Sequence, residues 1–311
     1  MGSLSSLAIL LLFIITAYTA PGADSMWREP TSRTVADCFP SAQEPDFALF
    51  CTETQDFIRV LLMAEFMILL VAGLVAGAMN AAAGGGSFVT LPAMVFAGVP
   101  SVEANASSTV ALFPGAIASV YAYRHDFRPF EVLSLRVMLA VSMVGGLVGA
   151  FLLLVTPSKR FDEIVPWLLL TGTLVFAFGG RAGVLLRRVV RIGPLTLLGC
   201  QFLLGIYCGY FGGAVGIMTL AVWSLLGMTD IRAMNATKTL VVGATNGVAV
   251  VCFILAGKVW WPQTVIMLSA AIVGGYGGAQ FARRVPPQHL RLGISVFNCL
   301  ITAVFFVRAA R

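Results

Sequence analysis

The chain has 311 residues, of which 59% are hydrophobic and only 11% are charged, and its mean hydropathy is +0.92. A soluble domain of this length needs far more polar surface to cover itself, so a soluble globular protein is excluded. The formal net charge of +6 comes from arginine and lysine in short loops. No basic patch alternates with aromatic residues, so we expect no nucleic-acid partner.

The chain begins with an apolar run, residues 7–20, that has the length of a secretory signal peptide. No lysine or arginine precedes the run, so an uncleaved anchor helix is the alternative for residues 1–20. The polar stretch at residues 21–57 contains Cys38 and Cys51, which would pair in a disulfide if this segment faces an oxidising compartment. We assign residues 21–57 to an extracytoplasmic segment.

Five apolar segments follow the polar stretch. About 20 apolar residues span a hydrocarbon core of ~30 Å, so most of these segments are long enough to cross a bilayer. The second segment is too short to cross on its own at ~1.5 Å per helical residue. We expect helices over residues 57–82, 88–96, 103–123, 130–155 and 164–178, with a Gly-rich break at residues 84–87.

A basic linker, residues 184–193, leads to five more segments, of which the second is again the shortest. We expect these helices over residues 194–211, 217–226, 234–255, 262–282 and 290–307, with a second Gly-rich break at residues 212–216. The chain therefore divides into a first transmembrane repeat, residues 58–183, and a second, residues 194–311.

The two groups of segments repeat each other at an offset that drifts only between 129 and 132 residues. The matching pairs include Gly73 and Gly205, Gly86 and Gly216, Asn105 and Asn235, Thr109 and Thr239, and Gly145 and Gly274. A duplicated apolar bundle with helices broken at matching places is typical of a secondary transporter whose site lies where the repeats meet. The predicted fold is an all-α polytopic membrane protein of two homologous repeats, each with a broken helix.

The relative orientation of the repeats depends on the short segment after each break. If the short segments complete a crossing, the repeats are inverted; if they turn back, the repeats are parallel. In the inverted arrangement, arginine and lysine are distributed ten to six between the two sides. By the positive-inside rule the richer side is cytosolic and the N-terminal segment lies outside. We favour inverted repeats in the plasma membrane.

Each repeat also contains pairs of glycines spaced four residues apart. The pairs are Gly73 and Gly77, Gly145 and Gly149, Gly205 and Gly209, and Gly274 and Gly278. Small residues at this spacing let two helix backbones approach closely in lipid, where packing replaces the hydrophobic effect. We interpret these glycines as helix-packing faces rather than as a site.

The two Gly-rich breaks are the first candidate site. A helix broken inside the bilayer exposes backbone groups that must be buried in protein or line an aqueous cavity. The N-terminus of the helix after each break attracts anions. A tight structural turn is the alternative interpretation. The candidate substrate-binding residues of the breaks are Gly85, Gly86, Ser87, Gly213 and Gly216.

The third helix of each repeat opens with a polar cluster, the second candidate site. Lys238 is the only lysine or arginine within the apolar stretch of its helix, about 10 Å along it from Ile231. An intramembrane lysine is costly and marks a functional position by default, with snorkelling to the interface as the alternative. The candidate residues here are Asn105, Ser108, Thr109, Asn235, Thr237, Lys238 and Asn246.

Three motifs together resemble a known family. They are the run from Gly73 through residues 84–87 to Leu91-Pro92, the matching run from Gly205 to residues 212–216, and the sequence AMNATK at residues 233–238. Over roughly residues 58–308 the chain resembles the sulfite exporter TauE/SafE-like membrane permeases. The resemblance implies export or exchange of small sulfur-containing anions such as sulfite or organosulfonates.

The chain departs from the family pattern at two places. The second break has Ala214 and Val215 where a fuller glycine run is expected, which narrows access to the backbone. Ser108 stands opposite Lys238, so the repeats supply one cation and not a symmetric pair.

The predicted function is secondary transport of a small inorganic or organosulfonate anion across a lipid bilayer, with a proton or other ion as coupling partner. An anion channel on the same scaffold is one alternative. A membrane receptor or assembly factor that acts through the N-terminal segment is another. We expect no enzymatic activity, because no nucleophile–base pair is evident. We expect no metal and no cofactor, and no cysteine spacing suggests zinc or iron–sulfur chemistry. The oligomeric state does not follow from the sequence.

Overall fold

The computed structural model describes residues 63–80, 85–125, 127, 134–189, 193–225, 231–282 and 287–309. Over this part of the chain every regular element is a helix, which confirms the predicted all-α fold. The expected signal peptide or anchor, the polar N-terminal segment, and the pairing of Cys38 with Cys51 lie outside the described residues.

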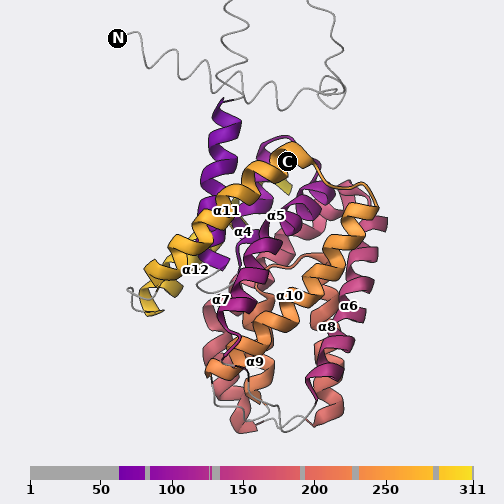
Figure 1. Ribbon diagram of the computed structural model, residues 1–311, viewed down its shortest axis with the longest axis vertical. Helices are drawn as coiled ribbons and strands as arrows, with labels where there is room; N and C mark the ends of the chain where they lie inside the picture. Colours follow the sequence, from indigo (N-terminus) through magenta and orange to yellow (C-terminus); the bar gives the residue numbers. More distant parts are fainter. Residues whose placement is uncertain are drawn as a thin grey trace, which may run out of the picture. The chain divides into compact units, whose positions relative to one another are not determined.

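The described helices follow the predicted segments in order (Figure 1). They are Met63–Asn80, α4 (Ser87–Phe96), α5 (Ser101–Ala122), α6 (Leu135–Val155), α7 (Ser158–Val189), α8 (Pro194–Tyr210), α9 (Val215–Leu225), α10 (Ile231–Leu255), α11 (Trp261–Ala282) and α12 (Pro287–Ala309). The largest difference is in α7, which continues to Val189 and takes in the first residues of the expected linker. Leucine and arginine dominate this end of α7, and both favour helix.

Three of the described helices are apolar enough and long enough to cross a membrane by composition alone: Met63–Asn80, α6, and Ala233–Leu255 within α10. The expected spans in α7, α8, α11 and α12 are not among them, and neither is the one in α5. Its polar residues Asn105, Ser107 and Ser108 are buried in the bundle, so they lower the mean hydropathy of α5 without facing lipid.

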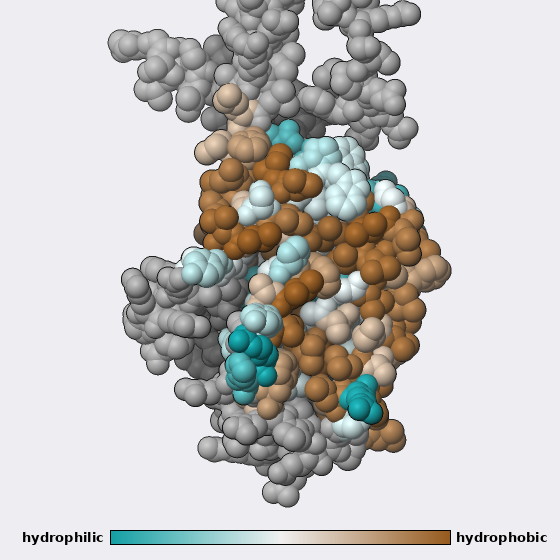
Figure 2. Space-filling view, in the orientation of Figure 1, coloured by the Kyte–Doolittle hydropathy of each residue, from teal (hydrophilic) through white to brown (hydrophobic). Residues whose placement is uncertain are grey.

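The outer surface of the bundle is apolar. Large side chains such as Phe151, Trp167, Leu203 and Val273 are more than 60% exposed, and Figure 2 shows hydrophobic residues over most of the described part of one face. Contiguous apolar surface of this extent is not stable in water. It matches the hydrocarbon core of a bilayer, as the composition predicts.

Two pairs of helices pack backbone to backbone at the paired glycines. A Cβ atom on Gly73 would lie 2.5 Å from the Met267 carbonyl oxygen, so helix Met63–Asn80 touches the backbone of α11. A Cβ atom on Gly145 would lie 2.5 Å from the Phe202 carbonyl oxygen, so α6 touches α8 in the same way. These contacts confirm the interpretation of the glycines as packing faces.

The contacts also fix the relative directions of the helices. Along α5 and α10, Phe113 lies beside Gly247 and Val120 lies beside Gly243, so these two helices are antiparallel. Along α6 and α8, in contrast, the contacts of Gly145 with Phe202 are followed by those of Gly149 with Ile206, so these helices are parallel. Helix Met63–Asn80 and α11 are parallel by the same criterion.

The short helices α4 and α9 lie inside the bundle. Every residue of α4 from Phe88 to Val95 is buried. In α9 the fully buried Trp223 donates from Nε1 to Gln201 Oε1 of α8 at 3.1 Å. Gln201 in turn donates to Ser142 Oγ of α6 at 2.8 Å. This network holds the C-terminal part of α9 against α6 and α8.

Candidate functional site

Both predicted breaks have left-handed backbone conformations. Gly85 has φ 102° and Gly212 has φ 78°, values that glycine adopts without steric penalty. Ala214 has φ 59°, the only positive φ of a non-glycine residue in the described chain. An L-residue in this region is strained by roughly 1–2 kcal/mol. This strained residue lies in the second break, where the family pattern predicts a glycine.

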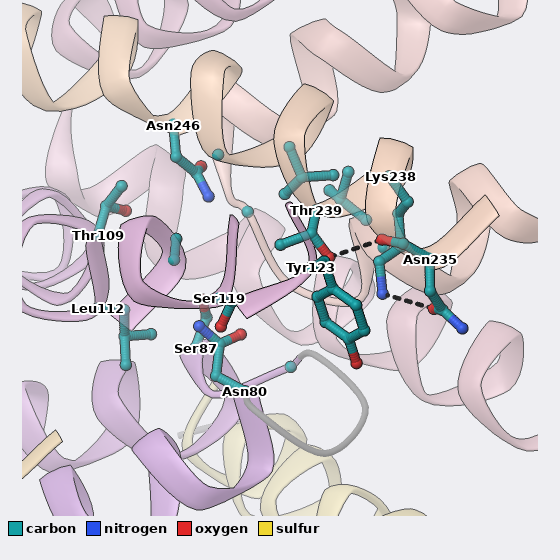
Figure 3. Close-up of a pocket in the computed structure, with 17 residues that line it drawn as sticks. Asn80, Ser87, Thr109, Leu112, Ser119, Tyr123, Asn235, Lys238, Thr239 and Asn246 are labelled. Atoms are coloured by element: carbon teal, nitrogen blue, oxygen red, sulfur yellow. Dashed lines mark hydrogen bonds between the residues drawn. The ribbon is translucent and has the colours of Figure 1, made fainter. Parts of the chain in front are cut away.

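Residues of the two breaks line one cavity of ≈ 150 Å³ (Figure 3). Gly85 and Ser87 come from the first break, and Gly212, Val215 and Gly216 from the second. The N-termini of α4 and α9 therefore open onto the same space. Each helix N-terminus is equivalent to about half a positive charge.

Two long helices supply the remaining walls. On α5 the lining residues recur every three or four positions, which places them on one helical face that continues to Tyr123 just past the helix end. The same spacing holds on α10. The residues from these helices are Thr109, Leu112, Ala116, Ser119 and Tyr123, and Asn235, Lys238, Thr239, Val242, Gly243 and Asn246, with Asn80 from helix Met63–Asn80.

Lys238 lies along the start of α9. A Cβ atom on Gly216 would lie 3.3 Å from Lys238 Cδ and 3.7 Å from Nζ, so the ammonium group is next to the N-terminus of α9. Its Nζ donates to Asn235 Oδ1 at 3.2 Å (Figure 3). Among the described lining residues Lys238 is the only cation, and none is a carboxylate. The one ionisable ammonium group of the described lining is therefore not balanced by a carboxylate of that lining.

The threonine and serine hydroxyls of the cavity wall are already used as donors. Thr109 donates to Asn105 O at 2.9 Å, Ser119 to Gly115 O at 2.8 Å and Thr239 to Asn235 O at 2.7 Å. A carbonyl oxygen can only accept, so each hydroxyl proton points to its own helix. Toward the cavity these three side chains present oxygen lone pairs.

Seven of the twelve predicted binding residues line the cavity: Gly85, Ser87, Thr109, Gly216, Asn235, Lys238 and Asn246. The other five pack around it. Asn105 is buried and donates from Nδ2 to Tyr210 O at 2.9 Å. Ser108 is hydrogen-bonded to the Thr90 hydroxyl of α4.

Thr237, Gly86 and Gly213 also lie in the surrounding protein. Thr237 is buried. A Cβ atom on Gly86 would lie 2.7 Å from the Ala76 carbonyl oxygen, and one on Gly213 would lie 2.5 Å from the Phe211 ring. These two glycines therefore allow close packing at the breaks.

Several lining residues were not predicted. Ser119 and Tyr123 continue the helical face of Thr109, so the spacing on α5 contained the signal for them. Thr239 shares a face with Asn235 in the same way. Asn80 is a polar residue at the end of an apolar helix, which is a weaker signal.

An apolar helical bundle with a cavity between two broken helices is typical of membrane transporters. The model of one family, the sulfite exporter TauE/SafE family, matches residues 69–305. The chain belongs to this family, which confirms the resemblance found in the sequence motifs. The family agrees with a transport function and with an integral membrane protein.

Named relatives agree with this class. A probable membrane transporter protein of Haemophilus influenzae is 30% identical over 241 residues, which cover 76% of this chain and 92% of the relative. The probable membrane transporter protein ORF9 of Sinorhizobium sp. is 31% identical over 69% of this chain and 82% of its own length. The probable membrane transporter protein YfcA of Escherichia coli K12 is 29% identical over 76% of this chain and 87% of its own length. No solved structure matches the chain significantly.

Proposed function

We propose that this protein is a secondary transporter of small sulfur-containing anions, such as sulfite or organosulfonates, which bind in the cavity between the broken helices. One observation carries the proposal: two helix N-termini and Lys238 meet in a cavity without a carboxylate among its described lining residues. Two helix ends and one ammonium group amount to roughly two positive charges. That balance suits a small oxyanion.

The anion would be held by donors from both breaks and from α10. Lys238 would supply the compensating charge, and the amide groups of Asn235 and Asn246 would supply hydrogen bonds. Ser87 and the first N–H groups of α4 and α9 would complete the site. Asn105 and Ser108 would act through packing, because their side chains bond to neighbouring elements.

We also propose that residues 58–183 and 194–311 are inverted repeats. In support, α5 and α10 contain the matching residues Asn105 and Asn235 and run antiparallel. The first helix of each repeat packs on the fourth helix of the other, since Met63–Asn80 contacts α11 and α8 contacts α6. Thr173 and Thr302, which are 129 residues apart, hydrogen-bond to each other at 3.1 Å.

The cavity lies toward one end of the bundle, which we assign to the cytosol. Its lining reaches Asn80 and Tyr123 at helix ends, next to Arg124 on the arginine-rich side. At the opposite end Lys258 Nζ pairs with Glu103 Oε1 at 2.8 Å, and Trp260 N donates to Ser107 Oγ at 2.9 Å. These contacts would close the outer end while the cavity is open to the inside.

Charge reversal should interfere with closure of this outer end. Glu103→Lys places two cations together at the outer end. A partly exposed ion pair such as Lys258 with Glu103 contributes about 0.5–1 kcal/mol, so we expect the variant to slow counterflow about twofold to fivefold. Adding Lys258→Glu restores opposite charges and should recover most of the rate. The initial rate of counterflow measures both. A double variant as slow as the single one would argue against this closure.

Transport itself is tested with purified protein in proteoliposomes. We expect saturable counterflow of radiolabelled sulfite that is inhibited by sulfoacetate and absent from protein-free liposomes. A channel would give flux without counterflow or saturation. Folded protein that shows neither flux nor sulfite binding would overturn the proposed substrate class.

The receptor alternative is tested by deletion of the N-terminal segment in a variant that retains an insertion signal. A carrier should keep its counterflow, because the cavity is formed by residues after Asn80 and by Asn80 itself.

A further inference from the structure

We propose that Cys208, a residue outside the cavity lining, is a positioning residue that gives the cavity its preference for anions by fixing the amide of Asn246. This inference rests on the proposed function, because it concerns the affinity of the same site. Cys208 belongs to α8 and is only 2% exposed. It acts on the anion through Asn246 alone.

The geometry fixes which end of the amide faces the cavity. Asn246 lines the cavity from α10, and Cys208 Sγ donates to its Oδ1 at 3.3 Å. A Cβ atom on Gly212, which follows α8, would lie 3.9 Å from the same oxygen. The amide oxygen is thus directed to α8 and the break. Figure 3 shows the Asn246 nitrogen directed into the space that the lining residues surround.

The direction of this amide matters because the cavity has few donors. An asparagine amide offers an accepting oxygen and a donating NH₂ group, and an anion binds only the latter. The hydroxyls of Thr109, Ser119 and Thr239 donate to their own helices. The other amide on α10, Asn235, has its oxygen engaged by Lys238.

Both amide oxygens on α10 are therefore held by protein donors, which leaves the NH₂ groups for a ligand. Without the thiol, the Asn246 amide can rotate about its last side-chain bond and present its oxygen to the cavity. That orientation repels an anion and favours a cation or a neutral donor. Cys208 thus affects the selectivity of the cavity for anions, and its substitution should leave the course of α8 unchanged.

The test compares three substitutions of Cys208 in the full-length protein. Cys208→Ala removes the donor, Cys208→Val fills the space without a donor, and Cys208→Ser keeps a donor. We expect the alanine and valine variants to bind sulfite about threefold to tenfold more weakly, as for the loss of one neutral hydrogen bond. Their maximal counterflow rate should stay at the wild-type value, and the serine variant should keep wild-type affinity.

Two controls separate positioning from packing. Cys200→Ala makes the same change on the same helix at a half-buried thiol outside the cavity lining, and should leave sulfite affinity unchanged. In an Asn246→Ala background, Cys208→Ala should have no further effect on affinity, because the group it positions is gone.

The measurements are sulfite titration of the purified protein and the KM and maximal rate of counterflow. Equal affinity in wild type and Cys208→Ala, or a serine variant as weak as alanine, would overturn the positioning role while the transport function stands. Wild-type protein that neither binds nor transports sulfite would overturn the proposed function, and this inference with it.

Discussion

Lys238→Ala is expected to lower the efficiency of sulfite transport by about tenfold to a hundredfold, because it removes the only cation among the described lining residues. A hydrogen bond to a charged group contributes about 1.5–3 kcal/mol, and the remaining helix ends supply only partial charges. The change should appear in the ratio of maximal counterflow rate to KM, measured in proteoliposomes with equal amounts of inserted protein.

The matched control is Lys159→Ala, which removes an exposed lysine at the start of α7 and should transport normally. Lys238→Arg keeps the charge, but the guanidinium needs more room beside Gly216, so we expect an intermediate efficiency. Normal transport by a folded Lys238→Ala variant would remove Lys238 from the proposed site.

Gly209→Ala is expected to destabilise the bundle by about 2–3 kcal/mol, and so to lower its unfolding temperature and the amount of folded transporter. The added Cβ atom would lie 2.9 Å from the Ala150 nitrogen and closer still to the Gly146 carbonyl group, both on α6. Backbone atoms cannot rotate away as a side chain can, so α6 and α8 must separate. Thermal unfolding in detergent, followed by size-exclusion chromatography, measures the effect.

Gly199→Ala provides the control on the same helix. A Cβ atom on Gly199 meets nothing within 4 Å, and alanine is the better helix former by about 1 kcal/mol. The Gly199 variant should therefore unfold at the wild-type temperature or above it. Similar unfolding of both variants would show that α6 and α8 do not depend on this contact.

The order and type of the helices could be predicted because lipid imposes a simple length and composition on each crossing. The breaks at Gly85 and Gly212 could be predicted as well, since glycine runs interrupt otherwise continuous apolar segments. The end of α7 could not be predicted, because arginine near the membrane surface is found both at the end of a helix and within a helix that continues. Composition alone also does not identify α5 as a membrane span, because the polar face of this helix is buried in the bundle.

The site could be predicted where a polar residue had no other reason to lie in an apolar helix, as for Lys238 and Asn246. It could not be predicted where residues at matching positions of the two halves make different contacts. Asn105 and Asn235 occupy matching positions, yet Asn105 bonds the Tyr210 backbone while Asn235 lines the cavity. The hydrogen-bond direction of the hydroxyls likewise depends on helix geometry that the sequence pattern does not contain.

The packing of Met63–Asn80 on α11 joins segments that are synthesised far apart in time. Gly73 and Gly77 are synthesised early, but the backbone they fit, at Met267 and Ala271, is nearly the last to emerge. Until then the two glycines of Met63–Asn80 lack this packing partner. A chain that stops before α11 therefore lacks the backbone against which Met63–Asn80 packs.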